Sequence, residues 1–116
     1  MEITQRVEDD ITVFLPDGRI DTLAADELDQ ALQATVTGGS HKIVVDMSGV
    51  DFICSLGLRA LASVLGKCRE EGGDMKIAAL NETLGRVFKI IGFDTLMSVH
   101  DTAEAAISEF SGSAAS

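Results

Sequence analysis

The stretch from residue 43 to residue 61 constrains the fold more than any other part of the chain. It begins with Ile43-Val44-Val45, whose β-branched residues show no polar alternation and therefore predict a strand covered on both faces. A polar turn follows, and from Leu56 to about Glu71 the apolar residues recur at helical spacing. Ser55 stands where this helix is expected to begin, so we expect its hydroxyl to cap N–H groups of the first turn. A buried strand that leads through a turn into an amphipathic helix is typical of α/β proteins.

The remaining segments alternate between strand and helix patterns. Residues 2–8 and 11–15 predict two strands joined by a tight turn at Asp9-Asp10, and Pro16-Asp17-Gly18 is expected to end the second strand. Gly66 interrupts the helix that follows Ser55, and we expect another backbone to pack close to it. Further helices are predicted to start at Asp21 or Thr22, at Asn81, and at Asp101 with an end near Phe110, and further strands are predicted at 75–79 and, as a sheet edge, at 97–99.

The resulting order is β-β-α-β-α-β-α-(β)-α. Strand–helix–strand alternation between residues 43 and 79 requires right-handed parallel crossovers, whereas the opening hairpin is antiparallel. We therefore predict a single α/β domain over residues 1–110, with a mixed β-sheet and helices packed on the sheet. Residues 111–116 are small and polar, and they predict a flexible C-terminal tail.

The acidic composition narrows the choice of partners. The chain has 9 Lys and Arg residues against 19 Asp and Glu residues, a net charge of −10, and a surface of this sign repels nucleic acid and anionic lipid. The expected partner is therefore a basic protein and not a nucleic acid. No apolar run approaches the roughly 20 residues that cross a bilayer, so no membrane insertion is expected. The first residues, Met-Glu-Ile-Thr-Gln, lack the pattern of a secretory signal, and we expect a cytoplasmic protein.

The cysteines and histidines argue against a disulfide or a metal site. The predicted helix holds Cys54 and Cys68 about 21 Å apart, which is beyond disulfide reach. These two thiols and the distant His41 and His100 offer no ready set of zinc ligands. We therefore expect free thiols, no metal and no cofactor.

A serine at a strand-to-helix turn also suggests the nucleophile elbow of a hydrolase, Gly-x-Ser-x-Gly. Gly57 fits that pattern, but Ile53 stands where the first glycine is needed, and His100 would have to meet Ser55 in the fold. A serine that only caps its helix is the ordinary alternative. The residues by themselves favour the plain cap, and they leave the hydrolase as a distant third hypothesis.

Several motifs together resemble one known family. The run Phe52-Ile-Cys-Ser-Leu-Gly-Leu-Arg-Ala-Leu61 is similar to the signature of STAS-domain anti-sigma factor antagonists, Phe-[Ile/Met]-[Asp/Ser]-Ser-x-Gly-Leu. Gly18-Arg-Ile-Asp21 resembles the Gly-x-[Leu/Ile]-Asp motif that follows the family's second strand, and Ile43-Val-Val-Asp46 resembles its central strand. The segment from Leu84 to Phe93 resembles its third helix. The resemblance covers nearly the whole chain, and its element order is the order predicted above.

The resemblance implies a phosphorylation-switched binding module and not an enzyme. In this family the serine that matches Ser55 is phosphorylated by the partner, an anti-sigma factor that is also a serine kinase with a Bergerat-type ATP site. The unphosphorylated antagonist binds the kinase and frees a sigma factor, and a PP2C-type phosphatase resets the antagonist. Ser55 is thus the expected phosphoacceptor, with the partner-binding surface formed by Asp21, Cys54, Ser55, Leu56, Gly57 and Arg59.

Three of these residues also have simpler interpretations. Asp21 caps a helix equally well, and Arg59 lies one turn from Ser55, where it either pairs with a phosphate or faces solvent. Cys54 replaces the acid or serine that is common in the family, as a small buried hydrophobe or as a reactive thiol. The alternative function is a STAS subunit that is never phosphorylated and serves as a structural docking element of a transport or signalling complex.

Overall fold

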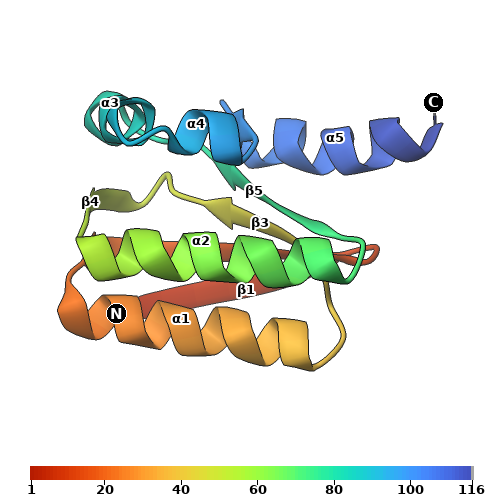
Figure 1. The fold of residues 1–116 in the computed structure, drawn as a ribbon, viewed down its shortest axis with the longest axis horizontal. Coiled ribbons are helices and arrows are strands. Elements are labelled where there is room, and N and C mark those ends of the chain that lie inside the picture. The colour runs from red at the N-terminus through yellow and green to blue at the C-terminus, as the bar shows by residue number, and fades with distance from the viewer. Residues whose placement is uncertain (116) are drawn as a thin grey trace.

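The computed structural model describes residues 1–115, and from residue 111 onward it describes the backbone alone. Figure 1 shows the helices above and in front of a single sheet. The elements are β1 (Glu2–Glu8), β2 (Ile11–Ile20), α1 (Thr22–Thr37), β3 (Lys42–Asp46), β4 (Val50–Ile53), α2 (Ser55–Glu70), β5 (Asp74–Ala78), α3 (Glu82–Ile90), α4 (Phe93–Leu96), β6 (Val99–His100) and α5 (Ala103–Ala115).

The sheet is mixed, as predicted. Its strand order is β1-β2-β3-β5-β6, and β4 pairs with the second half of β2. The hairpin β1–β2 is antiparallel and turns at Asp9-Asp10, with Asp9 at a φ of 56°, while every other pairing among the described strands is parallel. The predicted α/β class with helices packed on a mixed sheet is therefore confirmed.

The helices cover the two faces of the sheet unequally. On one face, α1, α2 and α3 bury a large core that includes Phe14, Leu28, Leu61 and Phe88. On the other face, α5 packs over a smaller cluster that includes Val44. The predicted burial of β3 on both faces is confirmed, because Ile43 and Val45 belong to the large core and Val44 belongs to the small one.

Two predictions about the strands were wrong. Pro16-Asp17-Gly18 does not end β2, which continues to Ile20 with Pro16 paired to Ile3 of β1. β2 continues past the proline into its pairing with β4, and the register of that pairing shifts between Gly18 and Arg19. The expected polar turn before α2 contains β4 itself, a short strand stabilised by partners about thirty residues earlier in the chain.

The helix starts agree with prediction at some points and differ at others. Asp21 and Asn81 cap α1 and α3, since their side chains accept hydrogen bonds from the N–H groups of Ala24 at 3.0 Å and Leu84 at 2.8 Å. For α5, Thr102 replaces the expected Asp101, because its hydroxyl oxygen accepts from the Ala105 N–H at 3.1 Å.

The ends and contacts of the helices bring three further differences. The predicted end of the last helix near Phe110 was too early, because α5 runs to Ala115, and Ser116 of the predicted tail lies outside the described residues. The short helix α4 was not predicted. Among the described residues, no backbone outside its own helix packs against Gly66, where an added methyl group would meet nothing else within 4 Å.

No helix within residues 1–115 combines the length and the apolarity that a membrane span requires.

Candidate functional site

The N-termini of α1 and α2 lie side by side, because the strands that lead into them are paired. Ile20 of β2 is the parallel partner of Ile53 of β4, and the Cys54 N–H donates to the Ile20 carbonyl at 2.9 Å. The next residue after each strand is the N-cap of its helix, Asp21 for α1 and Cys54 for α2. The β2–β4 pairing therefore brings together two segments of the predicted partner-binding surface that are far apart in the sequence.

Ser55 is the first residue of α2 and not its cap, which corrects the sequence-based expectation. Cys54 occupies the N-cap position, and its side chain forms no capping hydrogen bond. The first turn of α2 contains no acidic residue, and the side chain of Ser55 is exposed. Because the first-turn N–H groups of a helix carry partial positive charge, this end of α2 favours an added anion.

Gly57 allows α2 to pack directly against the two strand ends. A Cβ atom at this position would lie 2.7 Å from Cγ1 of Ile53 and 3.0 Å from Cγ2 of Ile20. Both isoleucines are buried, so neither has open space to move into. The glycine thus fixes the height of the α2 N-terminus, and of Ser55, above the sheet.

Sequence reasoning missed one neighbouring contact. The guanidinium of Arg19 on β2 lies over the ring of Phe52 on β4, 4.3 Å from its centroid, and the Phe52 ring is partly exposed. This cation–π pair lies just before the two helix starts, because Arg19 and Phe52 are partners in the parallel register. No local pattern could have identified it, since the contact exists only when β4 pairs with β2.

An open groove of about 490 Å³ runs between α1 and α2 from this end. Leu56 and Arg59, two residues of the predicted surface, line its α2 side. The other lining residues are Thr22, Leu23, Ala25, Asp26, Asp29 and Gln33 from α1, and Ala60 and Ser63 from α2. The side chain of Arg59 is exposed and forms no ion pair with any residue that the structure describes.

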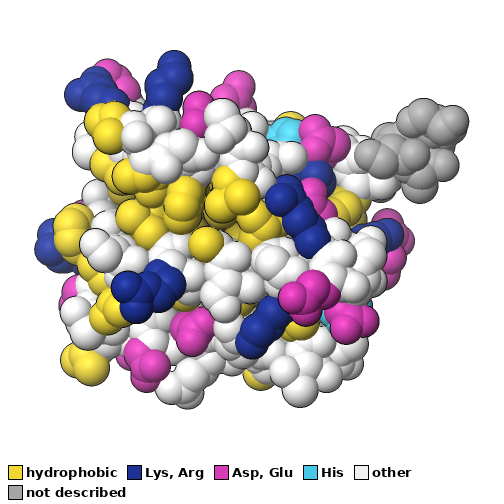
Figure 2. Space-filling model, viewed as in Figure 1, with side chains coloured by type: hydrophobic (Ala, Val, Ile, Leu, Met, Phe, Trp, Pro, Cys, Tyr) yellow, Lys and Arg dark blue, Asp and Glu magenta, His cyan; other side chains and the backbone are white. Residues whose placement is uncertain are grey.

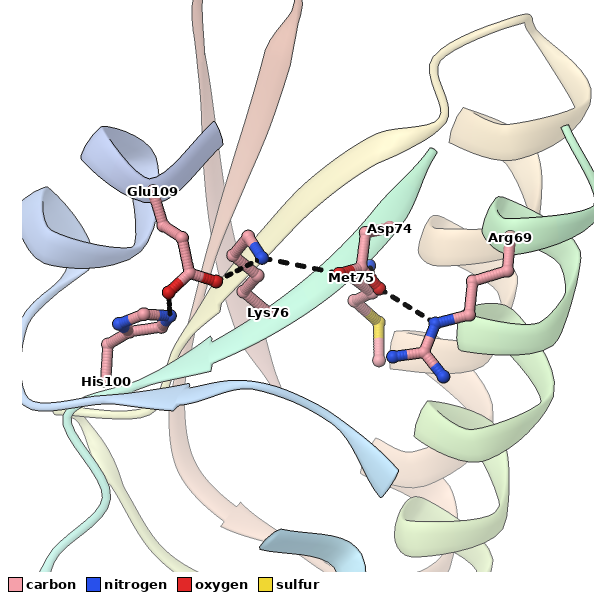
Figure 3. A network of polar contacts seen from close by, with 6 residues as sticks. All are labelled: Arg69, Asp74, Met75, Lys76, His100 and Glu109. Atoms are coloured by element: carbon pink, nitrogen blue, oxygen red, sulfur yellow. Dashed lines mark hydrogen bonds and ion pairs between the residues drawn. The ribbon is translucent and has the colours of Figure 1, made fainter. Parts of the chain in front are cut away.

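His100 does not approach Ser55, which removes the main support for a hydrolase. His100 lies on β6, and its Nε2 is 3.4 Å from a carboxylate oxygen of Glu109 on α5, on the opposite face of the sheet from α2 (Figure 3). The same carboxylate accepts from Lys76 Nζ at 2.6 Å, and the ammonium also contacts Asp74 at 3.3 Å. This polar network fastens α5 to the sheet.

The two cysteines form no disulfide, as expected. Cys68 is fully buried in the large core, and burial raises the pKa of its thiol to about 11, with a smaller contribution from the carboxylate of Asp74. Cys54 is half-buried beside the core. This intermediate exposure does not decide between a small buried hydrophobe and a reactive thiol.

Comparison with known proteins connects this arrangement to one family. The family model of the STAS domain matches residues 2–106. A Bordetella bronchiseptica protein, BtrV, which is named as a candidate anti-sigma factor antagonist, is 29% identical over 95% of this chain and 95% of its own.

Solved structures of similar proteins have the same fold. An anti-sigma factor antagonist from Mycobacterium paratuberculosis superimposes with a TM-score of 0.85 at 28% identity, covering 93% of this chain and 92% of that one. A candidate anti-sigma factor antagonist from Thermotoga maritima superimposes with a TM-score of 0.87 at 22% identity, covering 92% of each chain.

Proposed function

Because the chain belongs to the STAS domain family, we propose that it is an anti-sigma factor antagonist whose binding is switched by phosphorylation of Ser55. Support comes from two relatives that match nearly the whole chain at 28% and 29% identity, one named an anti-sigma factor antagonist and the other a candidate one. In this proposal the chain is a cytoplasmic binding module, and the enzymes of the cycle are its partners.

The cycle has two states. Unphosphorylated, the protein docks on an anti-sigma factor serine kinase with a Bergerat-type ATP site and so releases a sigma factor. The docking surface consists of Asp21, Cys54, Ser55, Leu56, Gly57 and Arg59. The kinase then transfers the γ-phosphoryl group of ATP to Ser55 Oγ, the hydroxyl proton is lost, and ADP leaves. A PP2C-type phosphatase hydrolyses the phosphate ester and restores the binding form.

The position of Ser55 carries this proposal. Its exposed hydroxyl is accessible to a kinase, and no capping bond has to break when it is modified. A phosphate adds about −1.5 to −2 charges at pH 7, and the first turn of α2 presents no acidic side chain to repel them. Such a charge at a helix N-terminus is favourable by about 0.3–1 kcal/mol, so the fold should accept the modification.

The partner kinase should not accept a phosphate on Ser55. Burying a phosphate dianion in an interface without paired cations costs several kcal/mol, and the nucleotide phosphates of the kinase add like-charge repulsion. Phosphorylation is thus expected to separate two equilibria: folding is unchanged or slightly favoured, while kinase binding is lost. Melting curves and calorimetric titration with the kinase measure the two effects independently.

The decisive experiment uses the wild type and Ser55→Ala with the anti-sigma factor kinase of the same genome and ATP. Intact mass should show one added phosphate on the wild type and none on Ser55→Ala, which should still bind the kinase. Ser48 and Ser63 are internal controls, because both are exposed serines near the site. Phosphate incorporation that persists on either serine in the variant contradicts the assignment of Ser55. Stable binding without any phosphorylation favours a fixed docking subunit instead.

A further inference from the structure

The groove between α1 and α2 leaves apolar side chains exposed at the Ser55 end. Leu23 in the first turn of α1 is 76% exposed, and Leu56 in the first turn of α2 is 45% exposed. The buried residues Ala25 and Ala60 line the bottom of the groove, and their small side chains leave space above them. Two leucines above a floor of alanines form a site that an apolar side chain from outside can fill.

The shape of the groove matches a short helix. Its lining residues on α1 run from Thr22 to Gln33 at helical spacing, and those on α2 run from Leu56 to Ser63. At 1.5 Å per residue, these stripes extend about 16 Å and about 10 Å, which is two to three helical turns. At the far end, Lys67 of α2 contacts Gln33 of α1 and closes the groove. An elongated groove between two helices is a common binding site for a third, amphipathic helix.

The charges along the groove indicate which charges a bound helix should carry. Asp26 and Asp29 stand on the α1 side, and within the described residues each accepts a side-chain hydrogen bond only from a glutamine amide of its own helix. Arg59 stands on the α2 side with no ion-pair partner within the described part of the chain. Figure 2 shows acidic and basic side chains along this boundary, whereas hydrophobic side chains line the boundary between α2 and the α3–α4 pair. A complementary helix is therefore basic on the edge that faces α1.

We propose that this groove binds an amphipathic helix of the anti-sigma factor partner, with leucine-like anchors between Leu23 and Leu56 and Lys or Arg residues opposite Asp26 and Asp29. The inference rests on the proposed function for the identity of the partner, and it adds the segment that the partner uses. Because the groove begins at Leu56, beside Ser55, a helix seated in it brings the partner over the phosphorylation site. A helix of this length is only marginally stable alone, so it is expected to belong to a folded partner domain.

The first test measures the affinity of the kinase for groove variants by calorimetry. The double variant Asp26→Lys/Asp29→Lys should lower the affinity about tenfold, since two favourable rim pairs become repulsive. The control Asp94→Lys/Asp101→Lys changes the net charge equally at exposed positions outside the groove and should leave the affinity unchanged.

A second pair of variants tests the apolar anchor. Leu23→Ala should weaken kinase binding several-fold, whereas Ile90→Ala should not. Ile90 on α3 is 77% exposed and lies outside the groove, which makes it a matched control for an exposed aliphatic side chain. Both wild-type side chains are mostly solvated, so both variants should remain folded, and melting curves verify this.

The second test does not depend on the kinase. A stapled helical peptide of about three turns, with leucines at i, i+4 and i+7 and lysines along one edge, is titrated into the isotope-labelled protein. Amide shifts should concentrate on Leu23, Ala25, Leu56 and Ala60, and a twin peptide with glutamates along that edge should bind about tenfold more weakly.

The two tests separate the groove from the proposed function. Kinase affinity that is equal for all groove variants and the wild type overturns the groove proposal while leaving the Ser55 switch intact. If the kinase does not bind the wild type, the proposed function fails, and the peptide titration decides about the groove. Equal binding of both peptides, no binding, or shifts outside the groove would then overturn it.

Discussion

Replacing Gly57 by alanine is expected to destabilise the protein, whereas the same replacement at Gly66 in the same helix is expected to stabilise it. A methyl group on Gly57 would lie 2.7 Å from Ile53 and 3.0 Å from Ile20. β-Branched side chains have few alternative rotamers, and both isoleucines are buried, so α2 would have to move away from the strand ends.

The magnitude follows from two opposing effects. Overpacking of this kind costs about 1–3 kcal/mol, while exchanging glycine for alanine inside a helix gains up to about 1 kcal/mol. We therefore expect Gly57→Ala to lower the free energy of unfolding by about 1–2 kcal/mol. Gly66 is exposed, and beyond its own helix the new methyl group would meet no described atom within 4 Å, so only the gain of about 0.5–1 kcal/mol applies.

Thermal and urea unfolding of the two variants measure this contrast directly. A change of 1 kcal/mol shifts the melting temperature by about 4 °C in a domain of this size, so the variants should melt about 6–12 °C apart. The matched pair cancels effects that are common to alanine in α2. If Gly57→Ala proves as stable as Gly66→Ala, the strand ends yield freely, and the close packing at Gly57 does not fix the position of the site.

Three further predictions follow from the same geometry. Ser55→Ala should change the free energy of unfolding by less than about 0.5 kcal/mol, because no capping hydrogen bond is lost. Ser55→Asp should raise the free energy of unfolding by about 0.3–1 kcal/mol. A loss of about 1 kcal/mol in the alanine variant would show that the Ser55 side chain does cap α2. The Lys76 ammonium holds the pKa of Glu109 below its ordinary value of 4.5, so the stabilisation by this ion pair is present above about pH 4.5 and is lost as the pH falls through the lowered pKa. Glu109→Gln should therefore be less stable than the wild type at pH 7, and the difference in the free energy of unfolding should shrink in acid. A difference in chemical denaturation that does not change with pH would argue against the ion pair. A thiol reagent at pH 8 should modify Cys54 well before Cys68, whose buried thiol has its pKa raised to about 11, and equal rates by mass spectrometry would contradict that burial.

The sequence determined those elements whose signals are local. The β-branched run Ile43-Val44-Val45 has no polar residue to place toward solvent, so only a strand covered on both faces accommodates it. Asp21 and Asn81 are caps because a side-chain oxygen and an N–H group three residues later lie in one turn. The hairpin and the α/β class follow from patterns of the same short range, whereas the choice of Ser55 as the candidate switch came from the family resemblance of the residues around it.

Tertiary structure decided the rest, and the reason is the distance between partners in the sequence. The segments 18–20 and 50–53 carry weak strand signals, and each becomes a strand because it supplies hydrogen-bond partners to the other. That pairing places Cys54 at the N-cap position of α2, and Ser55 becomes the first residue of the helix. It also places the starts of α1 and α2 together, and with them the groove between the two helices. A propensity within one segment cannot specify a surface that exists only when two segments meet.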